Sequence, residues 1–349
     1  MTRLAPTTLL AADIGGTFGR FCLMQAGRPI SEVHTLQRQS ASDLAALCAQ
    51  ALYDFGQPVS GAVLAIAAPL SAGHAKMTNA SWEVDEQQLA VALGLNRLLL
   101  INDFAALAWS LTALEPADVL TVPVVSVGIP SDAQEVSDQA PRVVFGPGTG
   151  LGVAALVYHE GRPQPIVSEG GHIGFAPADE FEQRVLEFAQ AHFAPVSWER
   201  ILSGPGLELI DEVSRLQLGV PGPSRSAAQI VAAAQAGNCP VAAHSIACFA
   251  NMLGSFGGDL ALMFRANGGV VIGGGIALRI ASLISLAQLR QRFARKGRFS
   301  GWLEKLPLSI LRSPNAALLG AARAYAEHFP ESATSDHLDA GRRQRATGN

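Results

Sequence analysis

Two glycine-rich turns carry residues that could bind phosphate groups. The first is Asp13-Ile14-Gly15-Gly16-Thr17, and the second is Gly146-Pro147-Gly148-Thr149-Gly150; each follows an apolar run. Glycine lets the backbone turn tightly and bring its N–H groups close to an anion, and threonine adds a hydroxyl donor. Many β-hairpins contain such turns without a ligand, so either turn alone is weak evidence. Two turns, one in each half of the chain, indicate two lobes that bind one polyphosphate from opposite sides.

A carboxylate that could act as a base follows the apolar run at residues 98–101, in the segment Ile101-Asn102-Asp103-Phe104. Asp103 has two interpretations: it caps the helix that follows, or it accepts a proton from a substrate hydroxyl that attacks phosphorus. The cap is the more common role for an aspartate at such a junction. Ligands bind outside the carboxyl ends of strands in open α/β sheets, which supports the second interpretation. Asn102 offers both a donor and an acceptor, as a polyol requires.

Three further polar or glycine-rich segments each have a functional and a purely structural interpretation. In Glu169-Gly170-Gly171-His172, the carboxylate and the imidazole could point into one cleft, or they could belong to a simple polar turn. Glu199 is a candidate ligand or a solvated glutamate in a first helical turn. Gly273-Gly274-Gly275 follows a buried strand and could admit a nucleotide ring, or only a tight turn.

The elements that must position these residues alternate in an α/β pattern that is repeated. In the first half we expect strands at 8–13, 20–25, 32–36, 63–67 and 98–101, and helices at 42–55, 85–93 and 104–114, with Ser40 or Ser42 as the first N-cap. In the second half we expect strands at 142–146, 152–158, 164–168, 270–272 and 308–312, and helices at 179–193, 205–217, 226–236, 240–264 and 316–327. The hairpin with a glycine turn at its tip opens both halves, as in a duplicated domain.

Composition narrows the class of protein. A chain of 349 residues with 49% apolar and 15% charged residues predicts about two well-packed domains. A net charge of −4 argues against broad nucleic-acid binding. Four cysteines without CxxC spacing favour reduced thiols in the cytoplasm over a zinc site or disulfides. The apolar stretch 241–264 predicts a buried helix, not a membrane span, and no signal peptide is expected.

Six motifs occur in an order that resembles the bacterial ATP-dependent glucokinases of the hexokinase/actin-like superfamily. They are Asp13-Ile14-Gly15-Gly16-Thr17, Ile101-Asn102-Asp103-Phe104, Gly146-Pro147-Gly148-Thr149-Gly150-Leu151-Gly152, Glu169-Gly170-Gly171-His172, Glu199-Arg200-Ile201-Leu202-Ser203-Gly204 and Gly273-Gly274-Gly275. The resemblance covers about residues 8–326. The chain lacks the cysteine-rich zinc motif of the related repressor/open-reading-frame/kinase (ROK) family, so it is similar to the non-zinc branch.

The resemblance implies a two-lobed α/β fold of the actin/hexokinase type, with duplicated ribonuclease-H-like domains and an interlobe cleft. We expect a small domain at 1–112 plus about 313–329, a large domain at 113–312, and a disordered tail at 330–349. The C-terminal helix would therefore cross back to the small domain. A homodimer is also implied.

The resemblance also implies residue roles. Asp103 would be the general base on the 6-hydroxyl of glucose, and the other sugar hydroxyls would be held by Asn79, Asn102, Glu169, His172 and Glu199. ATP phosphates would be bound by Thr17, Thr149 and the glycines Gly15, Gly16, Gly146, Gly148 and Gly150. Asp13 would position Mg²⁺ through water, and Gly273, Gly274 and Gly275 would lie near the adenosine.

Two features depart from the family pattern. Phe18 stands where the family has a small or polar residue, which predicts altered nucleotide affinity. The Gly273-Gly274-Gly275 turn is richer in glycine than is usual. The alternatives to a glucokinase are a kinase for mannose or fructose, a non-catalytic sugar or nucleotide sensor, and a donor such as ADP or polyphosphate. In none of these do we expect a nucleic-acid or membrane partner.

Overall fold

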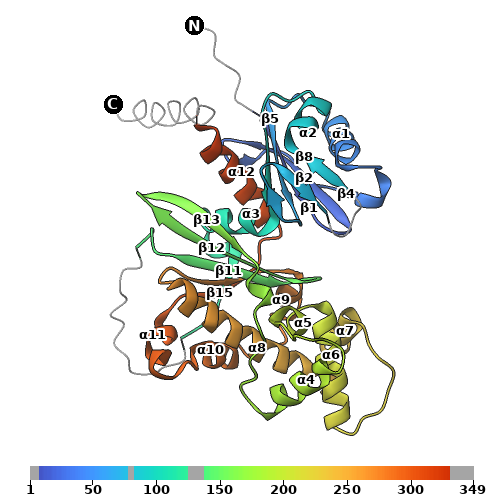
Figure 1. The fold of residues 1–349 in the computed structure, drawn as a ribbon, viewed down its shortest axis with the longest axis vertical. Coiled ribbons are helices and arrows are strands. Elements are labelled where there is room, and N and C mark those ends of the chain that lie inside the picture. Colours follow the sequence, from blue (N-terminus) through green and yellow to red (C-terminus); the bar gives the residue numbers. More distant parts are fainter. Residues whose placement is uncertain (1–7, 78–81, 125–136, 331–349) are drawn as a thin grey trace. The chain divides into compact units, whose positions relative to one another are not determined.

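The computed structural model describes residues 8–77, 82–124 and 137–330. Asn79 and nearly all of the expected C-terminal tail lie outside the described residues. The chain divides into two compact units, each shown in Figure 1: unit 1 comes from residues 1–114 and 314–349, and unit 2 from residues 115–313.

The sheet of unit 1 positions the first glycine turn and Asp103. Its strand order is β3-β2-β1-β5-β9, with β4 also paired to β2. The strands are β1 (Thr8–Ile14), β2 (Phe18–Gln25), β3 (Arg28–Pro29), β4 (His34–Gln37), β5 (Gly61–Ile66) and β9 (Leu98–Asn102). Strands β1, β5 and β9 run parallel, so their carboxyl ends share one edge.

Helices cover both faces of this sheet because its central strands are apolar on both sides. Helices α1 (Leu44–Phe55) and α2 (Glu86–Ala92) pack on the face that includes Leu10 and Ile14. Helices α3 (Asp103–Ser110) and α12 (Ala316–His328) pack on the opposite face and lie side by side (Figure 1). Gly320 of α12 has no room for a side chain, because a Cβ there would collide with the carbonyl oxygen of Ala106.

The sheet of unit 2 repeats the same plan. Its order is β10-β15-β14-β11-β12-β13. The strands are β10 (Val119–Thr121), β11 (Arg142–Pro147), β12 (Leu151–His159), β13 (Arg162–Ser168), β14 (Gly269–Ile272) and β15 (Leu308–Leu311). The hairpin β11–β12 corresponds to β1–β2, and the parallel neighbours β14 and β15 correspond to β5 and β9. The duplication expected from the sequence is therefore present in the strand pairing.

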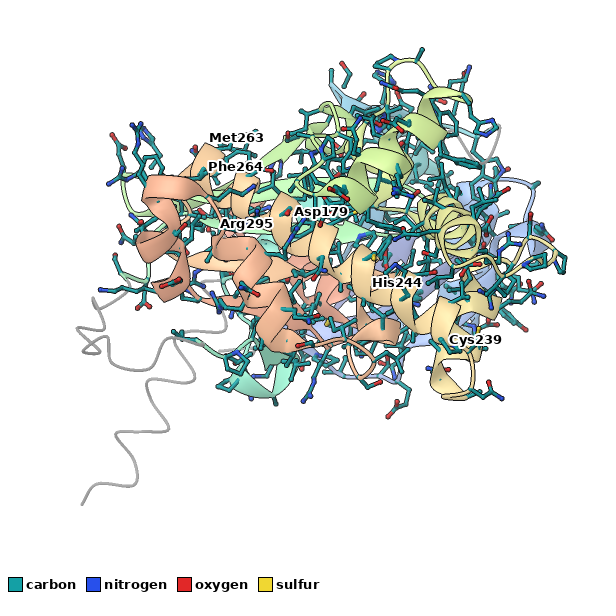
Figure 2. All side chains as sticks on the ribbon, turned by 90° about the horizontal axis from the view of Figure 1, so that it is seen from below. Asp179, Cys239, His244, Met263, Phe264 and Arg295 are labelled. Carbon is teal, nitrogen blue, oxygen red and sulfur yellow. The ribbon has the colours of Figure 1, made fainter. Side chains whose placement is uncertain are left out.

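The longest helix of unit 2 is α8 (Pro240–Phe264). Figure 2 shows it running from Cys239 to Met263 and Phe264. Within the described chain it is the one helix long and apolar enough to cross a membrane, but 67% of its most apolar window is buried. A Cβ at Gly254 would lie 2.6 Å from the Leu289 carbonyl oxygen, so α8 and α10 (Leu286–Ala294) pack closely. We therefore interpret α8 as a core helix.

Further helices, 3₁₀ turns and a small sheet complete the two units. Unit 2 also contains α4 (Glu180–Gln190), α5 (Trp198–Ile201), α6 (Gly204–Gln217), α7 (Ala227–Gln235), α9 (Gly275–Ile280) and α11 (Ser300–Lys305). Single 3₁₀ turns occur at Arg38–Ser40, Pro116–Asp118, Gly170–His172 and Gly297–Phe299. Unit 1 has a second sheet, which the sequence did not predict, of β6 (Leu70–Ser71), β7 (His74–Lys76) and β8 (Glu83–Asp85).

Candidate functional site

Asp103 is the first residue of α3 and directly follows β9. The cap of this helix is Asn102, whose Oδ1 accepts hydrogen bonds from the backbone N–H groups of Phe104 (2.9 Å) and Ala105 (3.2 Å). The interpretation of Asp103 as the N-cap is therefore wrong. Asp103 Oδ1 also accepts a hydrogen bond from Phe104 N–H (3.0 Å), but Asn102 already binds the N–H groups of Phe104 and Ala105, so the Asp103 carboxyl group is not the cap. Asn102 also donates from Nδ2 to the Ala68 carbonyl oxygen (3.3 Å), which leaves only part of its amide for a ligand.

A second carboxylate lies near Asp103 at the same edge of the sheet. Asp13 is in β1, and β5 separates β1 from β9. Burial, and secondarily the charge of Asp13, raises the pKa of Asp103 to about 6. Burial also raises the pKa of Asp13, and Arg20, whose Nη1 lies 3.9 Å from Asp13 Oδ2, partly opposes that rise. Two carboxylates with raised pKa values at the carboxyl ends of parallel strands are typical of an active site.

The first glycine turn joins β1 to β2, and its shape is set by hydrogen bonds. Gly15 N–H donates to the Phe18 carbonyl oxygen (3.0 Å). Arg38 binds the outer side of the turn: its Nε donates to the Gly16 carbonyl oxygen (2.7 Å) and its backbone N–H donates to the Thr17 carbonyl oxygen (2.9 Å). The side chain of Phe18 is 45% exposed. Thr17 is exposed and available to a ligand.

The second glycine turn joins β11 to β12 and lies against the Gly273-Gly274-Gly275 segment. Gly273 N–H donates to the Phe145 carbonyl oxygen (2.7 Å), and a Cβ at Gly146 would lie 2.7 Å from the Gly273 carbonyl oxygen. Gly274 has φ +83°, which favours glycine, and a Cβ there would collide with the Pro147 carbonyl oxygen. Both segments therefore need glycine because their backbones touch. The structure thus brings together the second glycine turn and the Gly273-Gly274-Gly275 segment, both of which the sequence analysis assigned to the ATP site.

Three of the residues predicted to hold sugar hydroxyls, Glu169, His172 and Glu199, form one cluster in unit 2, whereas Asn102 belongs to unit 1. His172 lies between two carboxylates: Nδ1 is 3.5 Å from Glu169 Oε2, and Nε2 is 3.5 Å from Glu199 Oε1. Glu169 and His172 are largely exposed, whereas the Glu199 side chain is only 27% exposed. Two carboxylates and an imidazole at a surface can accept and donate hydrogen bonds to several hydroxyl groups.

Glu199 also contacts the second glycine turn. Its Oε2 accepts a hydrogen bond from Leu151 N–H (2.9 Å), 48 residues earlier in the chain. A Cβ at Gly150 would lie 2.5 Å from the same oxygen, so Gly150 leaves the room that Glu199 occupies. The interpretation of Glu199 as a merely solvated first-turn residue is therefore wrong.

A cavity of about 280 Å³ adjoins both Thr149 and Glu199. Its walls include Phe188, Phe193 and Arg200, and the Arg200 guanidinium lies 4.5 Å from the centre of the Phe193 ring. The cavity was not expected from the sequence because its lining comes from residues far apart in the chain. Thr149 and Glu199 each border the cavity, so the phosphate-binding and sugar-binding candidates of unit 2 are neighbours.

Comparison with known proteins agrees with this arrangement. The family model described as glucokinase matches residues 10–328. A glucokinase from Aromatoleum aromaticum is 38% identical over 320 residues, which are 90% of this chain and 93% of that protein. The chain belongs to the glucokinase family.

Solved glucokinase structures share the fold. A glucokinase from an Antarctic psychrotroph has 30% identity and a TM-score of 0.79, over 92% of this chain and 99% of its own. A ROK family glucokinase from Streptomyces griseus, in complex with glucose and AMPPNP, has a TM-score of 0.60 at 20% identity and covers 91% of this chain and 98% of its own. The α/β, hexokinase-like class predicted from the sequence is confirmed. Five of the six motifs lie at strand ends or in adjoining turns, and the sixth, from Glu199 to Gly204, spans α5 and the start of α6.

Proposed function

We propose that this chain transfers the γ-phosphoryl group of ATP to the 6-hydroxyl of glucose, giving glucose 6-phosphate and ADP. The proposal is carried by Asp103, a partly buried carboxylate at the carboxyl end of a parallel strand. Its neighbour Asn102 is the helix cap, and the pKa of Asp103 is raised to about 6. Such a group is ionised at pH 7 and is more basic than an ordinary aspartate.

Asp103 acts as the general base. It accepts the proton of the 6-hydroxyl as that oxygen attacks the γ-phosphorus, and the bond from the γ-phosphorus to the bridging oxygen breaks to release ADP. Phosphoryl transfer needs positioning and charge neutralisation more than covalent participation by the protein. One well-placed carboxylate is therefore a sufficient proton acceptor.

Glu169, His172 and Glu199 hold the sugar hydroxyls, assisted by Asn102 and Asn79. The support is the cluster itself, in which His172 lies 3.5 Å from each carboxylate. A sugar with one hydroxyl inverted would leave a carboxylate oxygen without its partner, which costs binding energy. We therefore expect the cluster to discriminate glucose from its epimers.

The donor phosphates bind the backbone N–H groups of the two turns and the hydroxyls of Thr17 and Thr149, with the adenosine near Gly273, Gly274 and Gly275. The Streptomyces griseus enzyme, with its bound AMPPNP, supports ATP as the donor.

Mg²⁺ fits the donor set, with Asp13 as its protein partner through water. No group of three or more His, Cys, Asp or Glu residues in the described ranges could hold a metal on its own. Magnesium needs no such group, because it keeps waters and binds one or two carboxylates together with substrate phosphates. When bound, it neutralises phosphate charge.

The proposal includes a cytoplasmic location and a homodimeric state. All four cysteines are free thiols, which fits a reducing compartment such as the cytoplasm. A homodimer is expected from the family resemblance, and light scattering of the purified chain tests it.

A coupled assay tests the proposed reaction. ATP, ADP and polyphosphate are each combined with glucose, mannose and fructose in the presence of Mg²⁺. We expect the highest kcat/KM with ATP and glucose. A higher kcat/KM for another pair would reassign the substrate, and sugar binding without any turnover would identify a sensor.

A further inference from the structure

Arg38 lies beside the first glycine turn, although it is 22 residues from Gly16 in the sequence. The strand pairing of β2 with β4 places Phe18 opposite Gln37, so the residue after Gln37 reaches the turn. Arg38 then binds two consecutive carbonyl oxygens, that of Gly16 through Nε and that of Thr17 through its backbone N–H. The turn is therefore held from one side at two successive peptide groups.

These two bonds fix the direction of the N–H groups on the other side of the turn. A trans peptide is planar, and its C=O and N–H point in opposite directions. The Gly16 carbonyl shares its peptide with Thr17 N–H, and the Thr17 carbonyl shares its peptide with Phe18 N–H. With both carbonyls directed at Arg38, both N–H groups point away from it. Consecutive N–H groups with one direction form an anion-binding concavity.

The Arg38 guanidinium is itself held in place. It lies 5.3 Å from the centre of the Trp82 ring, within the range of a cation–π interaction. Trp82 packs against the core of unit 1, and its carbonyl oxygen accepts a hydrogen bond from Met77 N–H (3.0 Å). An aromatic face limits the orientations of a planar guanidinium, so Nε stays directed at the turn.

We propose that Arg38 is a positioning residue for the phosphoryl donor: its side chain orients the N–H group of Thr17 toward the phosphates by binding the Gly16 carbonyl oxygen behind it. The backbone bond from residue 38 to the Thr17 carbonyl oxygen orients the Phe18 N–H group in the same way and remains in any side-chain variant. Arg38 acts through the backbone of the turn and needs no contact with the substrate. The inference rests on the proposed phosphate-binding role of the first turn.

The test compares Arg38→Met and Arg38→Lys with the wild type, and uses Arg28→Met as the matched control. Arg28 is an exposed arginine of the same sheet, and it pairs with the opposite end of β2 from the turn. We expect both Arg38 variants to raise KM for ATP by roughly tenfold. This change corresponds to the free energy lost with one hydrogen bond to a charged group. KM for glucose and the melting temperature should stay close to those of Arg28→Met.

The lysine variant separates positioning from simple charge attraction. Lysine keeps the positive charge but lacks the Nε donor and the planar group. A normal KM for ATP in Arg38→Lys would overturn the positioning role, as would equal changes in both KM values or a large loss of melting temperature in Arg38→Met.

A Thr17→Val variant tests separately whether the first glycine turn binds phosphate, and the wild type tests whether the chain phosphorylates a sugar at all. If the wild type phosphorylates glucose and Thr17→Val raises KM for ATP while Arg38→Met does not, only the Arg38 inference fails. If Thr17→Val and Arg38→Met both leave KM for ATP unchanged, the phosphate role of the turn fails and the Arg38 inference fails with it. If the wild type phosphorylates no sugar, the proposed function itself fails.

Discussion

Replacing Asp103 with asparagine should remove activity and at the same time stabilise the protein. Asparagine has nearly the same shape and keeps an oxygen that can contact a sugar hydroxyl, but it cannot accept the proton. General-base catalysis contributes about 10²–10⁴-fold, so we expect kcat to fall by that factor while glucose binding survives.

The expected gain in stability follows from the pKa of Asp103, which is about 6 in the folded protein against 3.8 for an ordinary aspartate. Between these values the folded state holds a proton that the unfolded state has lost, so raising the pH through this window destabilises the wild type. At ~1.4 kcal/mol per pKa unit, the full cost above pH 6 is about 3 kcal/mol. Asparagine does not ionise and avoids this cost. The stability difference should therefore be near zero at pH 4 and reach its maximum above pH 6.

Chemical denaturation at pH 4.5, 6 and 8 measures this difference, and isothermal titration with glucose measures binding. The control is Asp138→Asn, which removes the same charge from an exposed position. An Asp103→Asn variant with unchanged kcat would refute the role of Asp103 as the base. A stability difference that is the same at all three pH values would refute the burial argument.

Three further predictions concern the pH dependence of catalysis and the substitution of Gly150 and Gly320. In the wild type, kcat/KM should fall about tenfold per pH unit below about pH 6, because protonated Asp103 cannot act as a base; a limb below pH 5 in a coupled assay would contradict this. Gly150→Ala should raise KM for glucose roughly tenfold by displacing Glu199, with little change in melting temperature. Gly320→Ala should instead lower the free energy of unfolding by about 2 kcal/mol or more, because its Cβ meets the Ala106 carbonyl oxygen, while KM stays unchanged in steady-state kinetics.

The main elements of the fold were predictable because their patterns are local. The apolar runs that became β1, β5 and β9 are bounded by glycine or polar residues, and helix α8 matches its expected range of 240–264. The small sheet β6-β7-β8 was missed because strands of two or three residues show no periodicity. Helix α1 is capped by Asp43, which accepts a hydrogen bond from Ala46 N–H (2.8 Å), and not by Ser40 or Ser42.

The candidate site was predictable as a set of residues but not as a set of contacts. Glycine turns and the Asn102-Asp103 pair can be read from the sequence, but which of two adjacent polar residues caps a helix depends on backbone geometry. Similarly, the bond from Leu151 to Glu199 joins residues 48 positions apart, and nothing near Gly16 indicates Arg38. Such contacts arise only when strand pairing brings distant segments together.

The two-segment construction of unit 1 has a consequence for synthesis on the ribosome. The sheet face with Leu9 and Val63 is covered partly by α12, which is translated about two hundred residues after α3. Unit 2 is a continuous stretch and can fold as soon as residue 313 has left the exit tunnel. Unit 1 must wait for nearly the whole chain, with an apolar surface exposed to chaperones in the meantime. A chain that ends at residue 313 and is released from the ribosome should therefore hold a folded unit 2 and an incomplete unit 1, the reverse of the usual vectorial order.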